Sequence, residues 1–214
     1  MASSGPSSGA GAPSPRAARS PLRERHAEAT RDAIVDAFVA QLLAEGGVGV
    51  NYAALARRAR VSIQTLYRHF PTRDALLDAL TRRVGIAMAL RELPHDREGV
   101  LATVRGLFPR FDQHAALVTA QVTAGTRSRV RARGRSRRAS AFEEVLATAT
   151  PHVRADRRRA AAGILHLLVS ANTWHRLRDE LGLDGAQSGE ITAWAVDTLW
   201  RALEAEDERA RRGR

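Results

Sequence analysis

The stretch "YAALARRARVSIQTLYRHF", residues 52–70, has the pattern of two short helices joined by a tight turn. We expect the first helix over residues 52–59 and the second over 63–70. Apolar side chains on both helices recur where the pair would pack against an earlier helix, and the small Ala56 suits the crossing point. These apolar positions are Leu55, Ala59, Val61, Leu66 and Phe70. The pattern predicts a helix-turn-helix.

Short polar residues stand directly before each helix of this region. Asn51 precedes the first helix, Ser62 the second, and Thr72 a further helix that begins "RDALLDAL". Such side chains accept a hydrogen bond from a free N–H group in the first turn, and so favour the start of a helix at that point. Pro71 ends the second helix.

The second helix carries a polar face opposite its apolar one. Gln64, Thr65, Arg68 and His69 lie on this face, with Tyr67 beside them. Short side chains rich in hydrogen-bond donors suit the base edges and phosphates of a DNA major groove. The sequence therefore predicts that residues 63–70 are a recognition helix.

The run "VSIQTLYRHFPTRDALL", residues 61–77, resembles the signature of TetR/AcrR-type transcriptional regulators, which reads roughly V-S-x-x-T-[LI]-Y-x-[HY]-F-x-x-[KR]-[ED]-x-L. The resemblance covers about residues 30–80. It implies a ligand-responsive transcriptional regulator, most often a repressor, that binds a near-palindromic operator as a homodimer and is released by a small-molecule effector. An activator would have the same architecture. The matching positions are Val61, Ser62, Thr65, Leu66, Tyr67, His69, Phe70, Arg73, Asp74 and Leu76.

The resemblance also implies residue roles. Gln64 and Thr65 would face bases or adjacent phosphates, while Tyr67, His69 and Arg73 would bind the DNA backbone. The complete set of expected DNA-binding residues is Asn51, Tyr52, Ser62, Gln64, Thr65, Tyr67, Arg68, His69 and Arg73.

Arg60 departs from the family pattern, because the family usually has glycine at this position of the turn. If the backbone there requires a positive φ, a side chain costs about 1 kcal/mol. Either the protein tolerates this strain, or the Arg60 guanidinium contacts DNA and offsets it in the complex. Arg60 therefore joins the candidate DNA-binding residues.

The whole chain is expected to be all-α, with about nine helices. Residues 1–24 are predicted to be a disordered basic arm, which is either solvated or lies along DNA. A three-helix DNA-binding domain would span 25–72, an all-helical effector-binding and dimerisation domain 73–206, and a charged tail 207–214. The first helix is expected from Thr30 to the glycines of "EGGVGV" (45–50). Beyond the helix-turn-helix and the helix after Thr72, helices are expected near 96–112, 115–124, 127–149, 155–181 and 188–206. Pro109 would end or kink the helix over 96–112.

The helix expected over 155–181 is apolar on two opposite faces, so it would be buried on both sides. A four-helix bundle across a two-fold axis satisfies this requirement. The candidate dimer residues are Leu167, Leu168, Ala171, Ile191, Trp194 and Leu199. An effector would bind among the middle helices, with His166 and Asn172 as its buried polar contacts. The candidate ligand-binding residues are Phe108, Phe111, Phe142, His166, Asn172 and Trp174.

The chain is strongly basic, with a formal net charge of +11, and all 34 of its basic residues are arginine. An excess of fixed positive charge indicates a polyanionic partner. Seven arginines cluster in "TRSRVRARGRSRR", residues 126–138, so RNA binding through this run is an alternative function. On a helix these arginines spread around the axis and leave no bulky apolar face, which argues against a membrane-surface helix.

Several other functions lack the required residues. No cysteine is present, and no apolar run reaches the roughly 18 residues of a membrane span. The sequence contains no H-E-x-x-H or G-x-S-x-G motif, and without lysine it cannot form a P-loop. We therefore expect a cytoplasmic protein that is not an enzyme and has no cofactor or metal site.

Overall fold

A computed structural model describes residues 21–46, 49–88, 94–124 and 129–213, with only the backbone given for 129–137. Over these ranges the regular structure consists of ten helices and no strands, which confirms the all-α prediction. None of these helices is both long and apolar enough to span a membrane. The helices are α1 (Pro21–Glu45), α2 (Tyr52–Arg58), α3 (Ile63–His69), α4 (Arg73–Ala87), α5 (Arg97–Gln113), α6 (Ala115–Thr123), α7 (Arg129–Ala149), α8 (Ala155–Leu168), α9 (Ala171–Leu181) and α10 (Gly185–Arg212).

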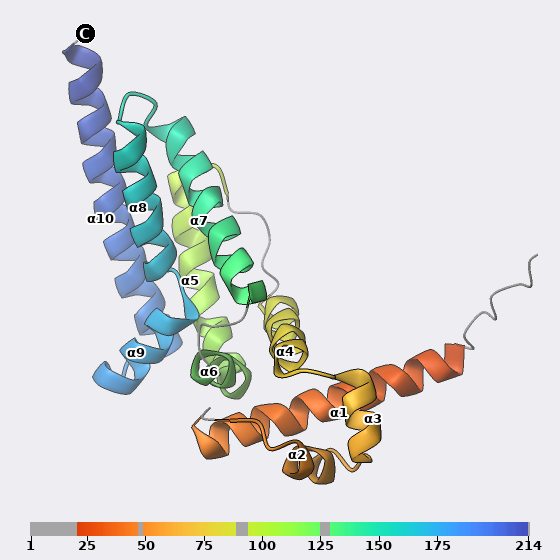
Figure 1. The fold of residues 1–214 in the computed structure, drawn as a ribbon. Helices are drawn as coiled ribbons and strands as arrows, with labels where there is room; N and C mark the ends of the chain where they lie inside the picture. The colour runs from red at the N-terminus through yellow and green to blue at the C-terminus, as the bar shows by residue number, and fades with distance from the viewer. Residues whose placement is uncertain (1–20, 47–48, 89–93, 125–128, 214) are drawn as a thin grey trace, which may run out of the picture.

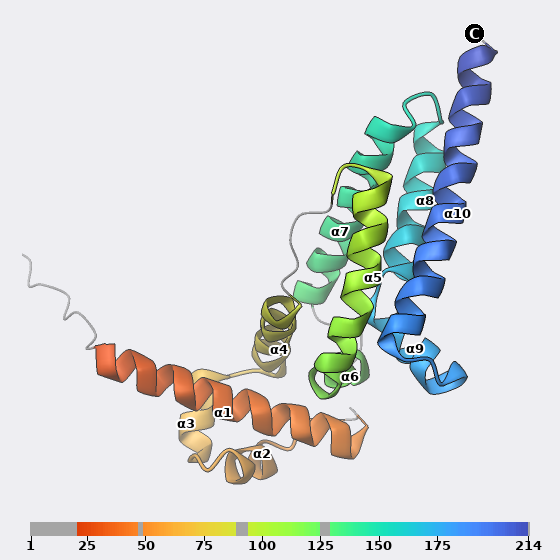
Figure 2. The same ribbon diagram turned by 180° about the vertical axis from the view of Figure 1, so that it is seen from behind.

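The helices form two parts (Figure 1). Helices α1, α2 and α3 make up one end of the molecule, and α5, α7, α8 and α10 run side by side in an upright bundle (Figures 1 and 2). Helix α4 leads from the first part to the second. Helix α6 lies between them and packs against both α1 and α4.

The N-terminal part has its own apolar centre. Ile34 and Phe38 of α1, Leu55 of α2, and Leu66 and Phe70 at α3 are all at most 1% exposed. The predicted helix-turn-helix contacts therefore form, and they fix the orientation of α3 on the first helix.

In the bundle, one carboxylate on α5 joins that helix to α9 and α10, which follow much later in the sequence. Asp112, on α5, accepts a hydrogen bond from Trp174 Nε1 of α9 at 2.8 Å and another from the backbone N–H of Gly185, the first residue of α10. Trp174 is fully buried. These bonds fix the start of α10 against the end of α5.

The first helix begins earlier than the apolar pattern predicted, at Pro21 rather than Thr30. Residues 21–24 are thus helical and do not belong to a disordered arm, while residues 1–20 lie outside the described part. Residues 21–29 are all exposed, so the extension has no apolar stripe to reveal it. Its strong helix formers, with proline in the first position, explain the helix instead. Gly46, at φ +62°, ends α1 as the sequence predicted.

The single helix predicted over 155–181 is wrong, because the chain breaks at Val169 and Ser170 into α8 and α9. Ser170 caps α9 by accepting a hydrogen bond from the Thr173 N–H at 3.3 Å. This break accounts for ten helices instead of about nine.

The last helix is longer than predicted at both ends. It begins at Gly185 after a capping box formed by Asp184 and Gln187. It continues to Arg212, so residues 207–212 are helical and do not form a separate tail. Asp207 explains this extension in part, since it accepts hydrogen bonds from the backbone N–H groups of His152 and Val153 in the turn before α8. Pro109 also lies within α5 and does not end it.

Candidate nucleic-acid interface

Side-chain caps fix the start of both helices of the helix-turn-helix. Asn51 Oδ1 accepts a hydrogen bond from the Ala54 N–H at 3.0 Å, and Ser62 Oγ accepts one from the Thr65 N–H at 3.0 Å. Thr72 caps α4 in the same way. The three predicted caps are confirmed.

Helix α3 has one buried face and one exposed face. Leu66 is fully buried, whereas Gln64, Tyr67 and Arg68 are exposed. Thr65 and His69 are half-buried beside them. The polar groups that the sequence assigned to base edges are therefore presented outward from a helix that is rigidly held from behind.

Two tyrosines predicted to bind DNA lie against each other. The rings of Tyr52, at the start of α2, and Tyr67, on α3, are stacked with centroids 4.9 Å apart and planes 5° from parallel. Burial and the neighbouring Tyr67 raise the pKa of Tyr52, and the charge of Arg73 opposes the rise. The Tyr52 phenol therefore keeps its proton and can donate its O–H to a phosphate.

His69 lies in a cationic environment at the end of α3. Burial, followed by the charges of Arg68 and Arg31, lowers the pKa of His69 below its ordinary value. The imidazole is therefore neutral at pH 7, and one ring N–H is available to a DNA phosphate. Its protonation would become more favourable next to that phosphate.

Sequence reasoning missed two residues at this surface. Arg31 of α1 lies over the ring of Phe70, with its guanidinium carbon 4.8 Å from the ring centroid. Ile63, the first residue of α3, is 49% exposed. Ile63 was missed because it shares the 3- and 4-residue spacing of Leu66 and Phe70, and this spacing predicts a buried side chain. Arg31 was missed because no local sequence pattern relates it to α3.

Arg73 does not point freely outward. Its Nη2 donates to the carbonyl oxygen of Ala124, directly after α6, at 3.4 Å, and the side chain is partly buried. The residue predicted to pair with a phosphate thus lies at the junction of the two parts of the molecule.

Residues 34–80 match a family model described as bacterial regulatory proteins, tetR family. The DNA-binding domain belongs to the TetR family. This agrees with the expectation of a DNA-binding transcriptional regulator that is not an enzyme. No curated protein sequence matches the chain.

Solved structures with a similar fold are also TetR-like. A TetR-like transcriptional regulator from Rhodococcus sp. RHA1 has a TM-score of 0.62 at 17% identity, covering 81% of this chain and 95% of the other. NalD of Pseudomonas aeruginosa, the secondary repressor of the MexAB-OprM multidrug efflux pump, has a TM-score of 0.60 at 18% identity, with 83% and 96% covered. A complex of SmeT with triclosan has a TM-score of 0.58 at 20% identity, with 81% and 91% covered. The TetR fold therefore extends over both parts of the chain.

The turn of the TetR-type domain has the left-handed backbone that makes glycine favourable there. Arg60 has a φ of +55°. Its N–H donates to the Arg57 carbonyl at 3.1 Å, and the Val61 N–H donates to the Ala56 carbonyl at 3.0 Å. This is the Schellman pattern that ends a helix at a left-handed residue. Arg60 is thus a strained replacement for glycine.

We predict that Arg60→Gly raises the free energy of unfolding by about 1 kcal/mol, because glycine adopts this φ without strain. Urea denaturation followed by circular dichroism measures the change. Arg58→Gly is the matched control, since Arg58 is the last residue of α2 and lies in ordinary helical backbone, so glycine there should lower stability instead of raising it. A variant at position 60 that is no more stable than the parent would contradict the strain. Unchanged operator affinity and salt dependence would exclude a DNA contact by Arg60.

The residues predicted to line an effector site fall into two groups. Phe108, Phe111 and Trp174 pack together, with successive ring centroids 5.6 and 5.8 Å apart. Phe142 and His166 are also buried, on α7 and α8. Asn172 is exposed, so its prediction as a buried polar contact is wrong. The break before α9 explains the error, since it changes which residues of α9 face inward.

The predicted dimer residues also fall into two groups, which differ in how exposed their side chains are. Leu167, Ile191 and Trp194 are 65%, 45% and 64% exposed. The other three are half-buried against the protein's own core: Leu168, Ala171 and Leu199. Sequence reasoning missed Ile164, which is 47% exposed on α8.

The arginine run of 126–138 is only partly described. Residues 126–128 lie outside the described part, and Arg129 begins α7. The run therefore belongs to a different part of the TetR-type fold from the recognition helix.

Proposed function

We propose that the protein is a ligand-responsive repressor that binds a near-palindromic operator as a homodimer and is released by a small-molecule effector. The observation that carries this proposal is the capped recognition helix α3 within a TetR-type domain, with Gln64, Tyr67 and Arg68 exposed on one side and Leu66 buried on the other. In this proposal residues 25–72 bind DNA, residues 73–206 bind the effector and the second subunit, and the protein acts in the cytoplasm.

The proposed DNA contacts follow from the exposed chemistry of the interface. Gln64, Arg68 and Thr65 would reach base edges or nearby phosphates in the major groove. The stacked Tyr52 and Tyr67 would hold the backbone through their hydroxyl groups. The remaining candidates, which supply backbone N–H groups, a ring N–H or a guanidinium, are Asn51, Ser62, His69, Arg60 and Arg73.

The exposed apolar side chains of α8 and α10 support the homodimer. These two helices lie side by side (Figures 1 and 2). Each helix leaves two large apolar side chains exposed, Ile164 and Leu167 on α8 and Ile191 and Trp194 on α10, and exposed apolar surface marks an interaction site where such side chains adjoin. A second copy is the partner that a near-palindromic operator requires, because a two-fold axis presents two recognition helices about one turn of DNA apart.

Two observations support an effector site coupled to DNA binding. NalD is named a repressor, and SmeT was solved with triclosan, which is a small molecule. In this chain, α6 contacts α1, α4 and α9, and Arg73 at the start of α4 is bonded to the end of α6. A ligand that moves α6 would therefore shift both α4 and a DNA-contacting arginine. A coupling of about 1–3 kcal/mol would loosen operator binding about 5- to 150-fold.

The experiment that tests the function is binding to the DNA that flanks the protein's own gene, at several salt concentrations and with candidate effectors added. We expect specific binding that weakens with salt and is lost with an effector. Equal affinity for any duplex would contradict the proposal.

We predict that Arg68→Ala weakens operator binding by about 1–3 kcal/mol, or roughly 5- to 150-fold, and reduces discrimination at one base pair. Fluorescence anisotropy with operator and mutated operators measures both effects. Arg82→Ala is the matched control, because Arg82 is exposed on α4 away from α3. Equal losses in the two variants would show that Arg68 contributes only general positive charge.

A further inference from the structure

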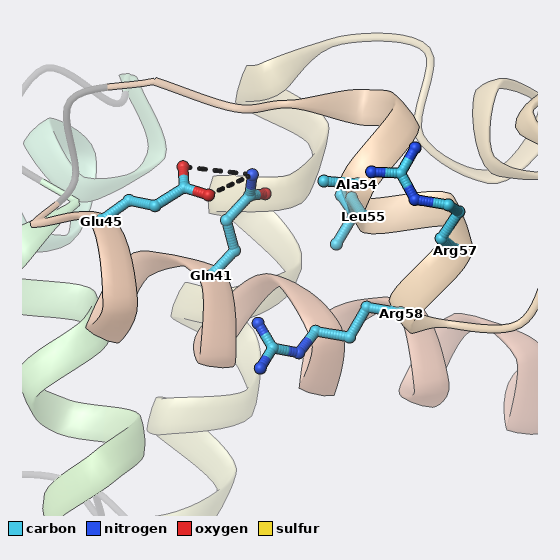
Figure 3. A pocket seen from close by; sticks show the side chains of 6 residues that line it. All are labelled: Gln41, Glu45, Ala54, Leu55, Arg57 and Arg58. Atoms are coloured by element: carbon cyan, nitrogen blue, oxygen red, sulfur yellow. Dashed lines mark hydrogen bonds between the residues drawn. The ribbon is translucent and has the colours of Figure 1, made fainter.

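A hollow of about 350 Å³ lies between α1 and α2, on the DNA-binding domain and apart from the effector site proposed within residues 73–206. We call it the α1–α2 hollow. Its volume is at the lower end of the range for small-molecule sites. Figure 3 shows its lining residues: Gln41, Glu45, Ala54, Leu55, Arg57 and Arg58.

A buried amide in the wall of the hollow lacks half of its hydrogen bonds. Gln41 is 3% exposed, and its Nε2 donates to both carboxylate oxygens of Glu45 at 3.2 Å and to the Asn51 carbonyl at 3.5 Å. All these partners are acceptors. Exchanging Nε2 and Oε1 of the Gln41 amide would therefore place its oxygen against other acceptors, so the assignment of the two atoms is fixed. Its Oε1 has no hydrogen-bond partner among the described residues. A buried acceptor without a donor is unfavourable, and a donor brought by a ligand would remove that cost.

The hollow also has opposite charges at its two ends. Glu45 lies at one end and Arg57 at the other, with the Gln41 amide between them (Figure 3). Glu45 is the last residue of the 25-residue helix α1, where the helix dipole adds to its negative charge. Arg57 and Arg58 are exposed and form no hydrogen bond or ion pair through their side chains within the described ranges. One end therefore attracts a cation and the other an anion.

We propose that the α1–α2 hollow binds a small zwitterion of the α-amino acid type. Its ammonium group would lie at Glu45 and donate to Gln41 Oε1, and its carboxylate would pair with Arg57 at the opposite end. Guanidinium groups suit carboxylates because they donate two parallel hydrogen bonds. The Gln41 oxygen is shielded from solvent, so side chains that line the hollow must move for the ligand to reach it.

Thermal unfolding of the full-length protein tests this site with a panel of the twenty α-amino acids as probes. Acetate and methylammonium, each carrying one of the two charges, are the ligand controls. We expect at least one amino acid to raise Tm by several degrees at about a hundredfold excess over its Kd, and neither control to do so. Calorimetric titration of that amino acid should give one site per chain. If no amino acid raises Tm, the proposal is overturned.

Variants locate the binding. The double variant Arg57→Gln and Arg58→Gln keeps the fold, since both side chains are exposed, and should reduce amino-acid affinity at least tenfold. Gln41→Leu should do the same. Arg82→Gln is the matched control and should leave binding unchanged. Retained affinity in the double variant would place the ligand elsewhere and overturn the proposal.

Two other roles of the arginines would also overturn it. If Arg58→Gln lowers Tm without any amino acid present, Arg58 itself satisfies the Gln41 oxygen and the hollow closes on its own. If the double variant lowers the salt dependence of DNA binding while no amino acid binds, the arginines serve DNA phosphates instead.

Discussion

The double substitution Leu167→Asp and Trp194→Asp is expected to convert the protein to a monomer and to weaken operator binding more than 100-fold. Both side chains are about two-thirds exposed in the isolated chain, on the neighbouring helices α8 and α10. In the proposed dimer they become buried, and an unpaired carboxylate at that position carries a large desolvation cost. A monomer presents one recognition helix, so it loses the joint binding of two half-sites.

Sedimentation measures the mass, and fluorescence anisotropy on operator DNA measures the affinity. Circular dichroism should show unchanged helix content, since the altered residues are not part of the chain's own core. Ile86→Asp is the matched control: Ile86 is 80% exposed, but it lies on α4. If the double variant stays dimeric, the α8–α10 face is not the interface.

The parts of the fold that the sequence predicted correctly depend on residues close together in the chain. Asn51 and Ser62 each bond an N–H three residues away. The sequence leaves the positive φ of Arg60 open, because arginine does not favour this backbone and only the glycine usual in the resembling family suggests it. The amphipathic spacing of Leu66 and Phe70 likewise fixes the buried face of α3 without reference to the rest of the protein.

The errors concern contacts between distant residues or helices with no apolar stripe. The hydrogen bond between Arg73 and Ala124 joins residues 51 positions apart, and no spacing rule relates them. The break at Ser170 is a local signal, but the continuous apolar pattern of 155–181 outweighed it. As a result, Trp174 faces the core while Asn172 is exposed. For the candidate site, the motif located the recognition helix, whereas Arg31 is known only from how α1 packs on Phe70.

Helices α5 and α10 approach so closely that the first residue of α10 has no room for a side chain. A Cβ built on Gly185 would lie 2.6 Å from the Phe108 carbonyl oxygen, 2.7 Å from Asp112 Oδ2 and 2.8 Å from Pro109 Cα. Two of these three atoms belong to the backbone of α5, which cannot move without shifting the helix. The same approach lets the Gly185 N–H reach the Asp112 carboxylate that also holds Trp174.

Gly185→Ala is therefore expected to lower the free energy of unfolding by about 1–3 kcal/mol, because α10 must move away from α5 and weaken both bonds to Asp112. For a protein of this size that corresponds to a fall in Tm of roughly 2–4 °C per kcal/mol. Gly106→Ala is the matched control, since Gly106 lies on α5 with nothing within 4 Å of an added Cβ. Alanine should stabilise the helix at position 106 by about 1 kcal/mol. If calorimetry shows both variants to be more stable than the parent, the contact between α5 and α10 is looser than the structure places it.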